Sequence, residues 1–352
     1  MTMKKIFLVA FTVLLAFAAL AQPANYYNTT NGLTGEPLKM ALHDIIKGHT
    51  SITYAQLWDA FWSTDNKGDG IVWDMYSDIP GGTPAYQFQM VVDQCGNYSG
   101  EGDCYNREHS WPQSWFNNDA IARTDLHHIF PVDGYVNNKR SNYPYGEVKS
   151  TKWTSTNGSK LGPSNTPGYS GTVFEPIDEY KGDFARAMLY MSVRYYGEDA
   201  AWKNSDMADK SVLKPWAIDL LLRWNKQDPV SQKEKDRNNV IYDDYQHNRN
   251  PFVDDPEFAD RIWDPNWTGM AEPELPAILI YPNPVPQGGM VHLDFNDNRI
   301  NQLQISDLYG KIVFRRPVAE TISLPESLSC GCYCLQLLQE GHVVTNMRLL
   351  IN

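Results

Sequence analysis

Residues able to bind a metal, move a proton and hold a phosphate are concentrated between Asn106 and Gly146. Glu108 and the amide of Asn137 offer hard oxygen atoms of the kind that Mg²⁺ prefers. His109, next to Glu108, can take a proton from water near neutral pH, and the guanidinium of Arg140 can grip a phosphate. A metal bound here would polarise a phosphoryl oxygen, so the pattern indicates metal-assisted phosphodiester hydrolysis.

Other chemistries use the same residue types. A zinc protease would show His-Glu-x-x-His, whereas Glu108 and His109 are followed by Ser110-Trp111-Pro112, and no Cys-x-x-Cys pair lies near the later histidines. The Gly-x-Ser-x-Gly elbow is missing, but triads assemble in space, so a serine nucleophile stays open. His127 and His128 have the ordinary alternative of buried core residues, which we expect for one of them.

A strand and several helices would have to position these groups. Glu108 and His109 would point in different directions, one to a metal and one to a nucleophile, if the pair ends a strand. Apolar residues recur at helical spacing from Phe184 to Tyr195 and predict a core-facing helix, with Arg186 off its apolar stripe as an ordinary surface charge. Further helices are expected over 38–46, 54–61, 217–224 and 230–245, and a long loop over 149–169.

Length and charge limit the possible classes of protein. A chain of 352 residues with 42% hydrophobic residues can build two packed domains. Its net charge of −12 and pI of about 5.1 disfavour a broad nucleic-acid-binding surface, because phosphate contacts need Lys and Arg. A local basic cleft on an acidic protein remains compatible with this composition.

The first 21 residues predict a secretory signal peptide. Lys4 and Lys5 precede an apolar run over 6–20, and Ala19-Leu20-Ala21 is a small-residue cleavage site. The run is short for a membrane anchor, and no other stretch is apolar enough to span a bilayer. We therefore expect an exported protein with no stable membrane insertion.

The five cysteines fall into two groups. Export permits disulfides, and Cys95 and Cys104, nine residues apart, are the expected pair. Cys330, Cys332 and Cys334 alternate, so they would share one face of a strand. We expect them to be small buried residues rather than a metal site.

Composition changes at a proline-rich linker over 269–276. Residues 277–352 alternate in short apolar runs separated by turns, which predicts a small antiparallel β-sandwich. Together with the helices of residues 22–268, the chain is expected to be an α+β protein of two domains.

Several motifs lie along the chain: YNREHSWPQSWF at 105–116, TDLHHIFPVDGYVNNKRSNYPYG at 124–146, and the segments 174–187, 190–191 and 248–252. Together they resemble the endonuclease I family of secreted bacterial nucleases. Because they occur in the family's order across roughly residues 35–265, the likeness is more specific than one short pattern. It implies a mostly helical domain around a ββα-metal finger that cuts DNA, often RNA too, with little sequence preference and leaves 5′-phosphates.

The resemblance implies roles for the matching residues. His109 matches the family's general base, Glu108 matches a Mg²⁺ ligand, and Asn137 matches a second ligand on the helix of the finger. Mg²⁺ is therefore the implied cofactor, with Mn²⁺ and Ca²⁺ as other candidate cations.

The resemblance also implies supporting residues. His127 or His128 would support the finger behind the metal ligands. An arginine near the scissile phosphate is implied as well, and Arg123, Arg140 and Arg186 are its candidates. For Arg186, buttressing of the finger is the alternative to a phosphate contact.

The tail resembles the C-terminal sorting domain of type IX secretion substrates. The likeness rests on segments 280–284, 305–310, 324–328 and 331–335, followed by Gly341. It implies that the type IX machinery is a partner and routes the protein out of the cell. Cys332 and Cys334 stand where that family usually has small or aliphatic residues. A β-domain that binds carbohydrate or another surface is the alternative.

The sequence therefore predicts a secreted, monomeric, Mg²⁺-dependent and sequence-nonspecific endonuclease for DNA, with RNA as a further substrate. His109 would activate the attacking water, and a metal on Glu108 and Asn137 would stabilise the leaving 3′-oxygen. A phosphodiesterase for small nucleotides or lipids is one alternative. A surface-binding protein with an inactive nuclease site is the other, and the presence of all three residues disfavours it.

Overall fold

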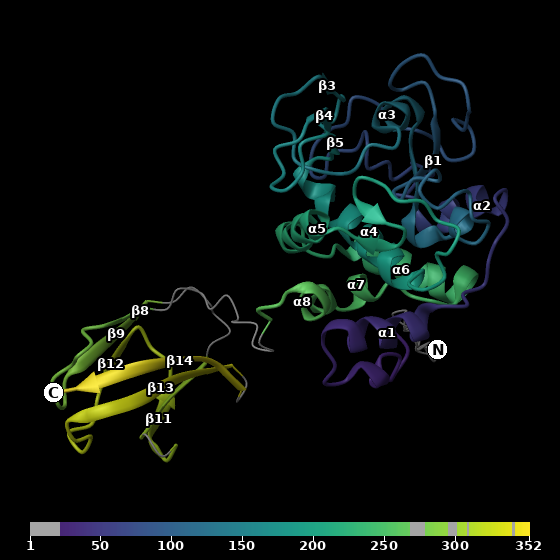
Figure 1. The fold of residues 1–352 in the computed structure, drawn as a ribbon. Coiled ribbons are helices and arrows are strands. Elements are labelled where there is room, and N and C mark those ends of the chain that lie inside the picture. Colours follow the sequence, from purple (N-terminus) through teal and green to yellow (C-terminus); the bar gives the residue numbers. More distant parts are fainter. Residues whose placement is uncertain (1–21, 268–278, 295–300, 308–309, 340–341) are drawn as a thin grey trace, which may run out of the picture. The chain divides into compact units, whose positions relative to one another are not determined.

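A computed structural model of the chain describes residues 22–267, 279–294, 301–307, 310–339 and 342–352 (Figure 1). The predicted signal peptide over 1–21 and linker over 269–276 lie outside these residues. The chain divides into two compact units, Met1–Trp267 and Thr268–Asn352. Each unit is described by itself.

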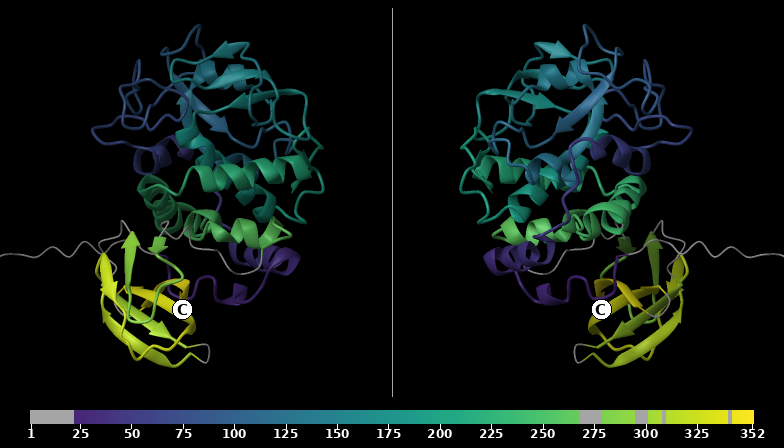
Figure 2. Two further views of the ribbon diagram at one scale, coloured as in Figure 1. Left: turned by 90° about the vertical axis from the view of Figure 1, so that its left-hand side faces the viewer. Right: turned by 90° about the vertical axis from the view of Figure 1, so that its right-hand side faces the viewer.

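The first unit combines helices with short antiparallel strands. Its helices are α1 (Gly35–Ile46), α2 (Gln56–Thr64), α3 (Gly134–Arg140), α4 (Lys181–Arg194), α5 (Pro215–Gln227), α6 (Gln232–Val240), α7 (Pro251–Asp254) and α8 (Glu257–Trp263). Its strands are β1 (Tyr105–His109), β2 (Ile129–Asp133), β3 (Trp153–Thr154), β4 (Lys160–Pro163), β5 (Thr172–Glu175), β6 (Ala208–Asp209) and β7 (Val212–Leu213). Figures 1 and 2 show α1, α7 and α8 at one end and α3 with β3–β5 at the other.

Helix α4 runs through the core of this unit. All 14 of its residues are buried, and it packs against α1, α5 and α7. The predicted helix is confirmed, but the surface position of Arg186 is wrong, because the helix is enclosed on every side. Its polar side chains therefore need internal partners: Lys181 lies 3.0 Å from Glu175, and Arg194 lies 3.0 Å from Glu198.

The other predicted helices are confirmed with shifted ends. Helix α6 begins with a capping box, in which the Ser231 and Glu234 side chains each accept a hydrogen bond from the other residue's backbone amide. The predicted helix over 230–245 continues beyond α6 as a π-helix over Ile241–Gln246. The predicted long loop over 149–169 is wrong in part, because β3 and β4 lie in it and join β5 in a small sheet.

The second unit is the predicted antiparallel sandwich. Its strands are β8 (Leu279–Tyr281), β9 (Met290–Asp294), β10 (Gln302–Ser306), β11 (Ile312–Pro317), β12 (Thr321–Ser323), β13 (Gly331–Gln339) and β14 (His342–Ile351). They form one sheet in the order β11-β10-β13-β14 and another in the order β12-β9-β8. Val291 and Leu293 of one sheet share a core with Leu303, Ile305 and Leu335 of the other.

The three cysteines of β13 and its preceding turn differ from their prediction. Cys330 is exposed, and Cys332 and Cys334 are half-buried. The core-facing positions of β13 are instead Leu335 and Leu337, because residues two apart on a strand share a face. The prediction of small buried residues is therefore wrong.

Cys95 and Cys104 form the predicted disulfide, with their Cα atoms 5.6 Å apart. The bond closes a loop that ends at β1. The backbone amide of Gly134, the first residue of α3, donates a hydrogen bond of 2.9 Å to the carbonyl of Cys104. A Cβ at Gly134 would lie 2.7 Å from the ring of Tyr98 in this loop, so the contact requires glycine. The disulfide loop thus braces the start of α3.

Replacing both Cys95 and Cys104 by serine should lower the free energy of unfolding by about 2–4 kcal/mol, because the unfolded chain loses a covalent constraint. All 11 tryptophans lie between Trp58 and Trp267, so tryptophan fluorescence during urea unfolding reports on the first unit of the intact protein. The matched control replaces Cys330 and Cys332 by serine in the second unit. An equal loss of unfolding free energy in both double variants would contradict a stabilising role of the Cys95–Cys104 disulfide in the first unit.

Candidate active site

Strands β1 and β2 and helix α3 form one compact ββα motif. The strands pair antiparallel, with Glu108 opposite Phe130 and His109 opposite Ile129. Helix α3 follows β2 without a linker, because the Asp133 side chain caps it by accepting a hydrogen bond of 2.8 Å from the amide of Val136. The strand end carrying the Glu-His pair therefore lies beside α3.

Glu108 is a buried carboxylate with one oxygen already engaged. Its Oε1 accepts hydrogen bonds from the hydroxyls of Tyr76 at 2.8 Å and Tyr145 at 3.4 Å, and it lies 3.0 Å from Nη1 of Arg140. Burial raises the pKa of Glu108 above its usual range, while Arg140 and the two hydroxyls lower it. A cation at the second oxygen would further favour the ionised form.

His109 is held in a defined orientation. Its Nε2 lies 3.1 Å from the backbone carbonyl of Arg123, and its Nδ1 lies 3.4 Å from the side-chain amide of Gln113. Because a carbonyl only accepts, Nε2 carries the proton and Nδ1 is left with its lone pair. Burial, then the neighbouring His128, lower the pKa of His109 to about 3. The imidazole is therefore neutral, and the lone pair of Nδ1 faces the amide of Gln113.

Asn137 lies beside the Glu-His pair. Its amide nitrogen donates to the side chain of Asn106 at 2.7 Å and to the carbonyl of Arg107 at 3.5 Å. Asn137, Glu108 and His109 line one open pocket of about 380 Å³. The structure thus brings together the three residues that the sequence selected.

The donor set of this pocket fits a hard cation. It offers the second carboxylate oxygen of Glu108 and the amide oxygen of Asn137, and Mg²⁺ is usually held by one or two carboxylates and several waters. Within the described ranges, no group of three or more His, Cys, Asp or Glu side chains is placed to hold a metal ion. A closed zinc-type site is therefore not formed by these residues.

Arg140 lies at the pocket, but its guanidinium faces the protein. The side chain is 1% exposed and is ion-paired with Glu108. It also donates to the backbone carbonyls of His109 at 3.0 Å and Ser110 at 2.6 Å. The predicted phosphate grip is therefore corrected: Arg140 compensates the buried carboxylate and holds the end of β1.

Arg186 is not part of this pocket. Its guanidinium is buried and binds the Glu234 carboxylate through Nε at 2.6 Å and Nη2 at 2.9 Å. It also donates to the side chain of Asn225 and to the carbonyl of Asp228. The predicted phosphate contact of Arg186 is therefore wrong, because protein acceptors occupy its guanidinium. These contacts join α4 to α5 and α6.

His127 and His128 lie on the 3-10 turn η3 (Leu126–His128), which leads into β2. The Nε2 of His127 lies 3.1 Å from the carbonyl of Asn248, and the Nε2 of His128 lies 2.7 Å from the carbonyl of Ala122. The rings of His128 and His109 pack edge to face with centroids 5.6 Å apart. Both histidines are thus buried supports behind the pocket.

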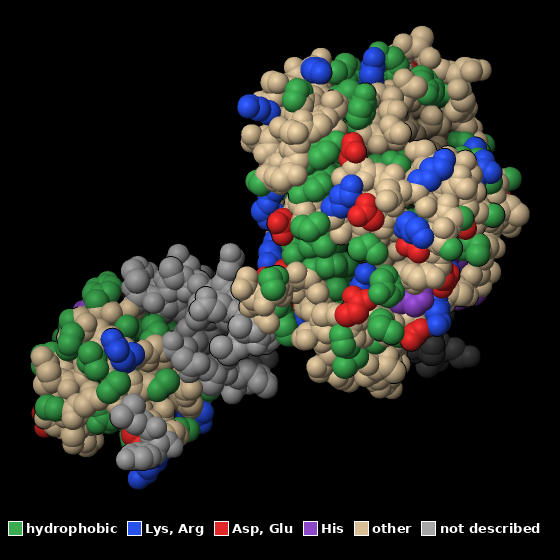
Figure 3. Space-filling view, in the orientation of Figure 1, with side chains coloured by type: hydrophobic (Ala, Val, Ile, Leu, Met, Phe, Trp, Pro, Cys, Tyr) green, Lys and Arg blue, Asp and Glu red, His purple; other side chains and the backbone are tan. Residues whose placement is uncertain are grey.

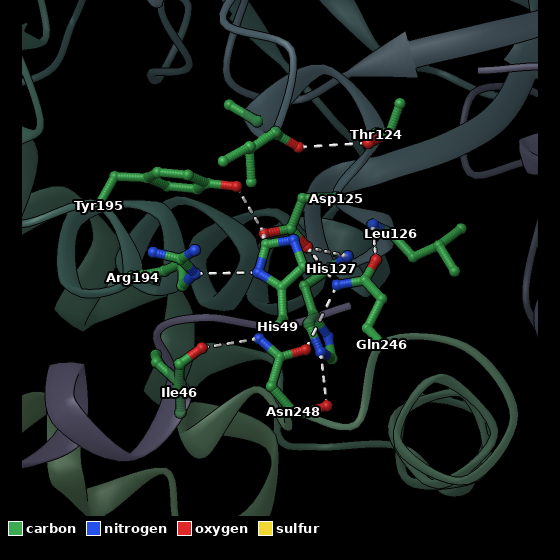
Figure 4. A network of polar contacts seen from close by, with 12 residues as sticks. Ile46, His49, Thr124, Asp125, Leu126, His127, Arg194, Tyr195, Gln246 and Asn248 are labelled. Carbon is green, nitrogen blue, oxygen red and sulfur yellow. Dashed lines mark hydrogen bonds and ion pairs between the residues drawn. The ribbon is translucent and has the colours of Figure 1, made fainter. Parts of the chain in front are cut away.

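Asp125 anchors the turn that carries these histidines (Figure 4). Its carboxylate accepts hydrogen bonds from Tyr195 at 3.0 Å and Gln246 at 3.0 Å. It also accepts one from Tyr190 at 2.8 Å. Although burial alone would raise it, nearby His49 and the other partners hold the pKa of Asp125 below its usual range. The network ties η3 to α4 and to the segment after α6.

The chain matches two protein families over most of its length. Residues 34–257 match Endonuclease I, and residues 279–352 match the secretion system C-terminal sorting domain. The chain belongs to the endonuclease I family. This endonuclease I protein is therefore a nuclease, a hydrolase acting on nucleic acids, and its sorting domain marks it as secreted. Among its described residues, no helix has the length and apolar character needed to cross a bilayer.

Individual relatives agree with this family. An extracellular ribonuclease of Bacillus amyloliquefaciens is 41% identical over 251 residues, which are 69% of this chain and 79% of that protein. An extracellular ribonuclease of Bacillus subtilis (strain 168) is 37% identical over 260 residues, 71% of this chain and 83% of that protein. An endonuclease-1 of Buchnera aphidicola subsp. Baizongia pistaciae is 32% identical over 171 residues, 48% and 58% of the two chains.

Sequence reasoning missed several residues of the endonuclease I site. Tyr76 and Tyr145 bind Glu108, and Gln113 joins His109 to the Nε of Arg123 at 3.1 Å. Gln113 and Tyr145 had a signal in the sequence, since they lie in the motifs at 105–116 and 124–146. Tyr76 comes from a separate segment that the fold brings to Glu108.

Stability should fall as the pH falls from 7 toward 5. Burial lowers the pKa of His127 and of His128 to about 4, whereas an unfolded histidine titrates near 6.5. The unfolded chain therefore binds protons in this window that the folded chain does not, and each histidine should contribute on the order of 2 kcal/mol. Urea unfolding followed by tryptophan fluorescence at pH 7 and pH 5 measures the difference.

The substitution His127→Gln should shrink this pH difference by its own share. The matched control is His247→Asn, which replaces a solvent-exposed histidine and should leave the difference unchanged. A pH difference that is the same in His127→Gln as in the wild type would contradict burial as its cause.

Replacing Arg140 by methionine should destabilise the endonuclease I unit by about 3–5 kcal/mol, because it leaves Glu108 buried without its cation. Arg140→Lys, which keeps the charge but not the fork, should recover part of the loss. Urea unfolding followed by tryptophan fluorescence measures both variants. If Arg140→Met is as stable as the wild type but binds nucleic acid more weakly, the role of Arg140 would be a phosphate contact and not the stabilisation of Glu108.

Proposed function

We propose that this nuclease hydrolyses the phosphodiester bonds of DNA and RNA with one divalent cation, Mg²⁺, held by Glu108 and Asn137. The observation that carries the proposal is the orientation of His109. Its Nε2 proton is directed to the Arg123 carbonyl, so the lone pair of Nδ1, which has only a weak contact of 3.4 Å with the Gln113 amide, lies at a pocket that also contains Glu108 and Asn137.

His109 acts as the general base in this proposal. Its Nδ1 accepts a proton from water, and the carbonyl of Arg123 stabilises the imidazolium that forms at Nε2. Gln113, at 3.4 Å from Nδ1, marks the place where this water binds, because its amide occupies a weak hydrogen bond that water can replace. Mg²⁺, when bound, supplies positive charge to a phosphoryl oxygen and to the leaving 3′-oxygen.

The remaining residues keep the donors in place. Arg140 and the hydroxyls of Tyr76 and Tyr145 engage Oε1 of Glu108, which leaves the other oxygen for the cation. Asn106 accepts a hydrogen bond from the amide nitrogen of Asn137 and so fixes the orientation of this amide. These contacts preorganise the donors before substrate binds.

Both kinds of nucleic acid follow from a water nucleophile. Water attack needs no 2′-hydroxyl, so deoxyribose and ribose substrates are cleaved alike. Because the bond between phosphorus and the 3′-oxygen is the one that breaks, the products carry 5′-phosphates. The relatives named extracellular ribonuclease support RNA as a substrate, and the relative named endonuclease-1 supports a cut within the chain. No side chain assigned above reads a base edge, so little sequence preference is expected.

Two alternatives predict different results. A phosphodiesterase for small nucleotides or lipids would prefer a small ester such as bis-nitrophenyl phosphate over a polymer. A surface-binding protein with an inactive site would cleave neither. The proposal favours the polymer, because the pocket of about 380 Å³ is open rather than closed around a small ligand.

Incubation of the intact protein with supercoiled plasmid, single-stranded RNA and bis-nitrophenyl phosphate tests these readings. Mg²⁺ should support nicking and then degradation of both polymers, and EDTA should abolish it. His109→Ala should lower the rate by about 10²–10⁴-fold, as is typical for loss of a general base. Its binding of an oligonucleotide in EDTA should match the wild type.

The matched control is His43→Ala, which removes a histidine of α1 outside the pocket. Near-normal cleavage by His109→Ala would exclude His109 as the base. Full cleavage in EDTA would exclude the cation, and an intact plasmid and RNA in every reaction would favour the surface-binding alternative.

A further inference from the structure

The ring of Tyr54 lies between two arginines beside the candidate base. The guanidinium carbons of Arg107 and Arg123 are 3.6 Å and 4.0 Å from the centre of the ring. The same ring stacks near His109 at 6.2 Å with an interplanar angle of 21°. The guanidinium carbon of Arg107 also lies 4.4 Å from the centre of the Trp58 ring. Two cations are thus fixed by aromatic rings next to the pocket.

Neither arginine is neutralised by the protein. Within the described ranges, no carboxylate lies within 4.0 Å of Arg107 or Arg123, although acidic residues outnumber basic ones in the chain. The site's other nearby arginine, Arg140, is paired with Glu108. On the face seen in Figure 3, acidic and basic side chains are interspersed.

Most donor groups of the two arginines have no acceptor among the described residues. Arg107 donates through Nη1 to the carbonyl of Tyr54 at 2.8 Å, and Arg123 donates through Nε to Gln113 at 3.1 Å. Both side chains are half-buried rather than enclosed, and none of their remaining nitrogens is cut off from solvent. Burial and the neighbouring Arg123 lower the pKa of Arg107, as expected for cations held close together.

Stacking of this kind keeps a guanidinium flat and leaves its edge available for hydrogen bonds. Two guanidinium edges held by the same tyrosine ring suit an anion with several acceptor oxygens. Arg107 also lines the pocket of Glu108 and His109, so the anion would lie next to the reacting phosphate. A purely structural role for the stack would not require two unpaired charges.

We propose that Arg107 and Arg123 form a seat for a backbone phosphate of the nucleic acid next to the one that is cut, and that Tyr54 is the positioning residue that holds them. This inference rests on the proposed nuclease function and adds the means by which an acidic protein holds a polyanion. The seat binds phosphate and sugar-phosphate backbone, so it serves DNA and RNA alike.

The salt dependence of binding tests the seat. A fluorescein-labelled single-stranded DNA of 12 nucleotides is titrated with the intact protein in EDTA at several NaCl concentrations. Each lost phosphate contact should reduce the slope of log K against log salt by about 0.7. Arg107→Ala should show this reduction, and Arg123→Ala should show it as well. Binding should weaken alike for DNA and RNA of the same length.

Substitutions of Tyr54 distinguish a role in phosphate binding from a purely structural role. Tyr54→Ala removes no charge, yet it should flatten the salt slope toward that of the arginine variants, because the two guanidinium groups lose their orientation. Tyr54→Phe keeps the ring and should retain the wild-type slope. In Tyr54→Ala, a further Arg107→Ala change should have a smaller effect than it has in the wild type.

The matched control is Arg223→Ala, which removes an exposed arginine of α5 that is paired with Glu147. Tryptophan fluorescence checks that each variant is folded, and Tyr54→Leu replaces Tyr54→Ala if that variant is not. A wild-type slope in Arg107→Ala overturns the seat. A wild-type slope in a folded Tyr54→Ala or Tyr54→Leu overturns the role of Tyr54.

Cleavage assays separate this inference from the proposed function. The seat variants should raise KM for plasmid more than they lower kcat, whereas His109→Ala should act on kcat. If the wild type binds with the expected slope but cuts no polymer, the proposed function fails while the seat stands. If it cuts polymers with slopes unaffected by Arg107→Ala and Arg123→Ala, only the seat fails.

Discussion

The nuclease unit depends on keeping one carboxylate ionised inside the protein. Glu108 is buried, and burial by itself favours its neutral form. Arg140 and the hydroxyls of Tyr76 and Tyr145 offset this by engaging a single oxygen, Oε1. The arrangement explains why the arginine of α3 points inward. It also explains why β1, β2 and α3 must keep a fixed relation, since a shift of α3 would separate the pair.

A second buried carboxylate does the same for the turn behind the pocket. Asp125 holds η3 to α4 and the residue that follows it through the hydroxyls of Tyr190 and Tyr195. The turn η3 in turn presents His128 to the ring of His109. Helix α4 is therefore a frame rather than a source of reacting groups. Its own arginine, Arg186, is used to join helices.

The elements that short-range patterns specify were predictable from the sequence. The apolar spacing of α1 and α4 and the alternation of the tail strands predicted those elements, and residue chemistry selected Glu108, His109 and Asn137. The ββα arrangement that holds these three residues was implied by the family resemblance. The prediction failed where a side chain's partner is distant in sequence. Arg186 and Glu234 are 48 residues apart, and Tyr54 is 53 residues from Arg107, so neither charge could be assigned from its neighbours. The prediction for Cys332 and Cys334 was wrong for another reason. Alternation along a strand shows that two residues share a face, but it does not show which face is buried.

The disulfide before β1 links the geometry of the pocket to the compartment in which the chain folds. The loop that it closes contacts the first residue of α3, the helix that carries Asn137 and Arg140. Thiols stay reduced in the cytoplasm and pair after export. The contact between this loop and α3 therefore receives its covalent constraint only after the chain has left the cytoplasm.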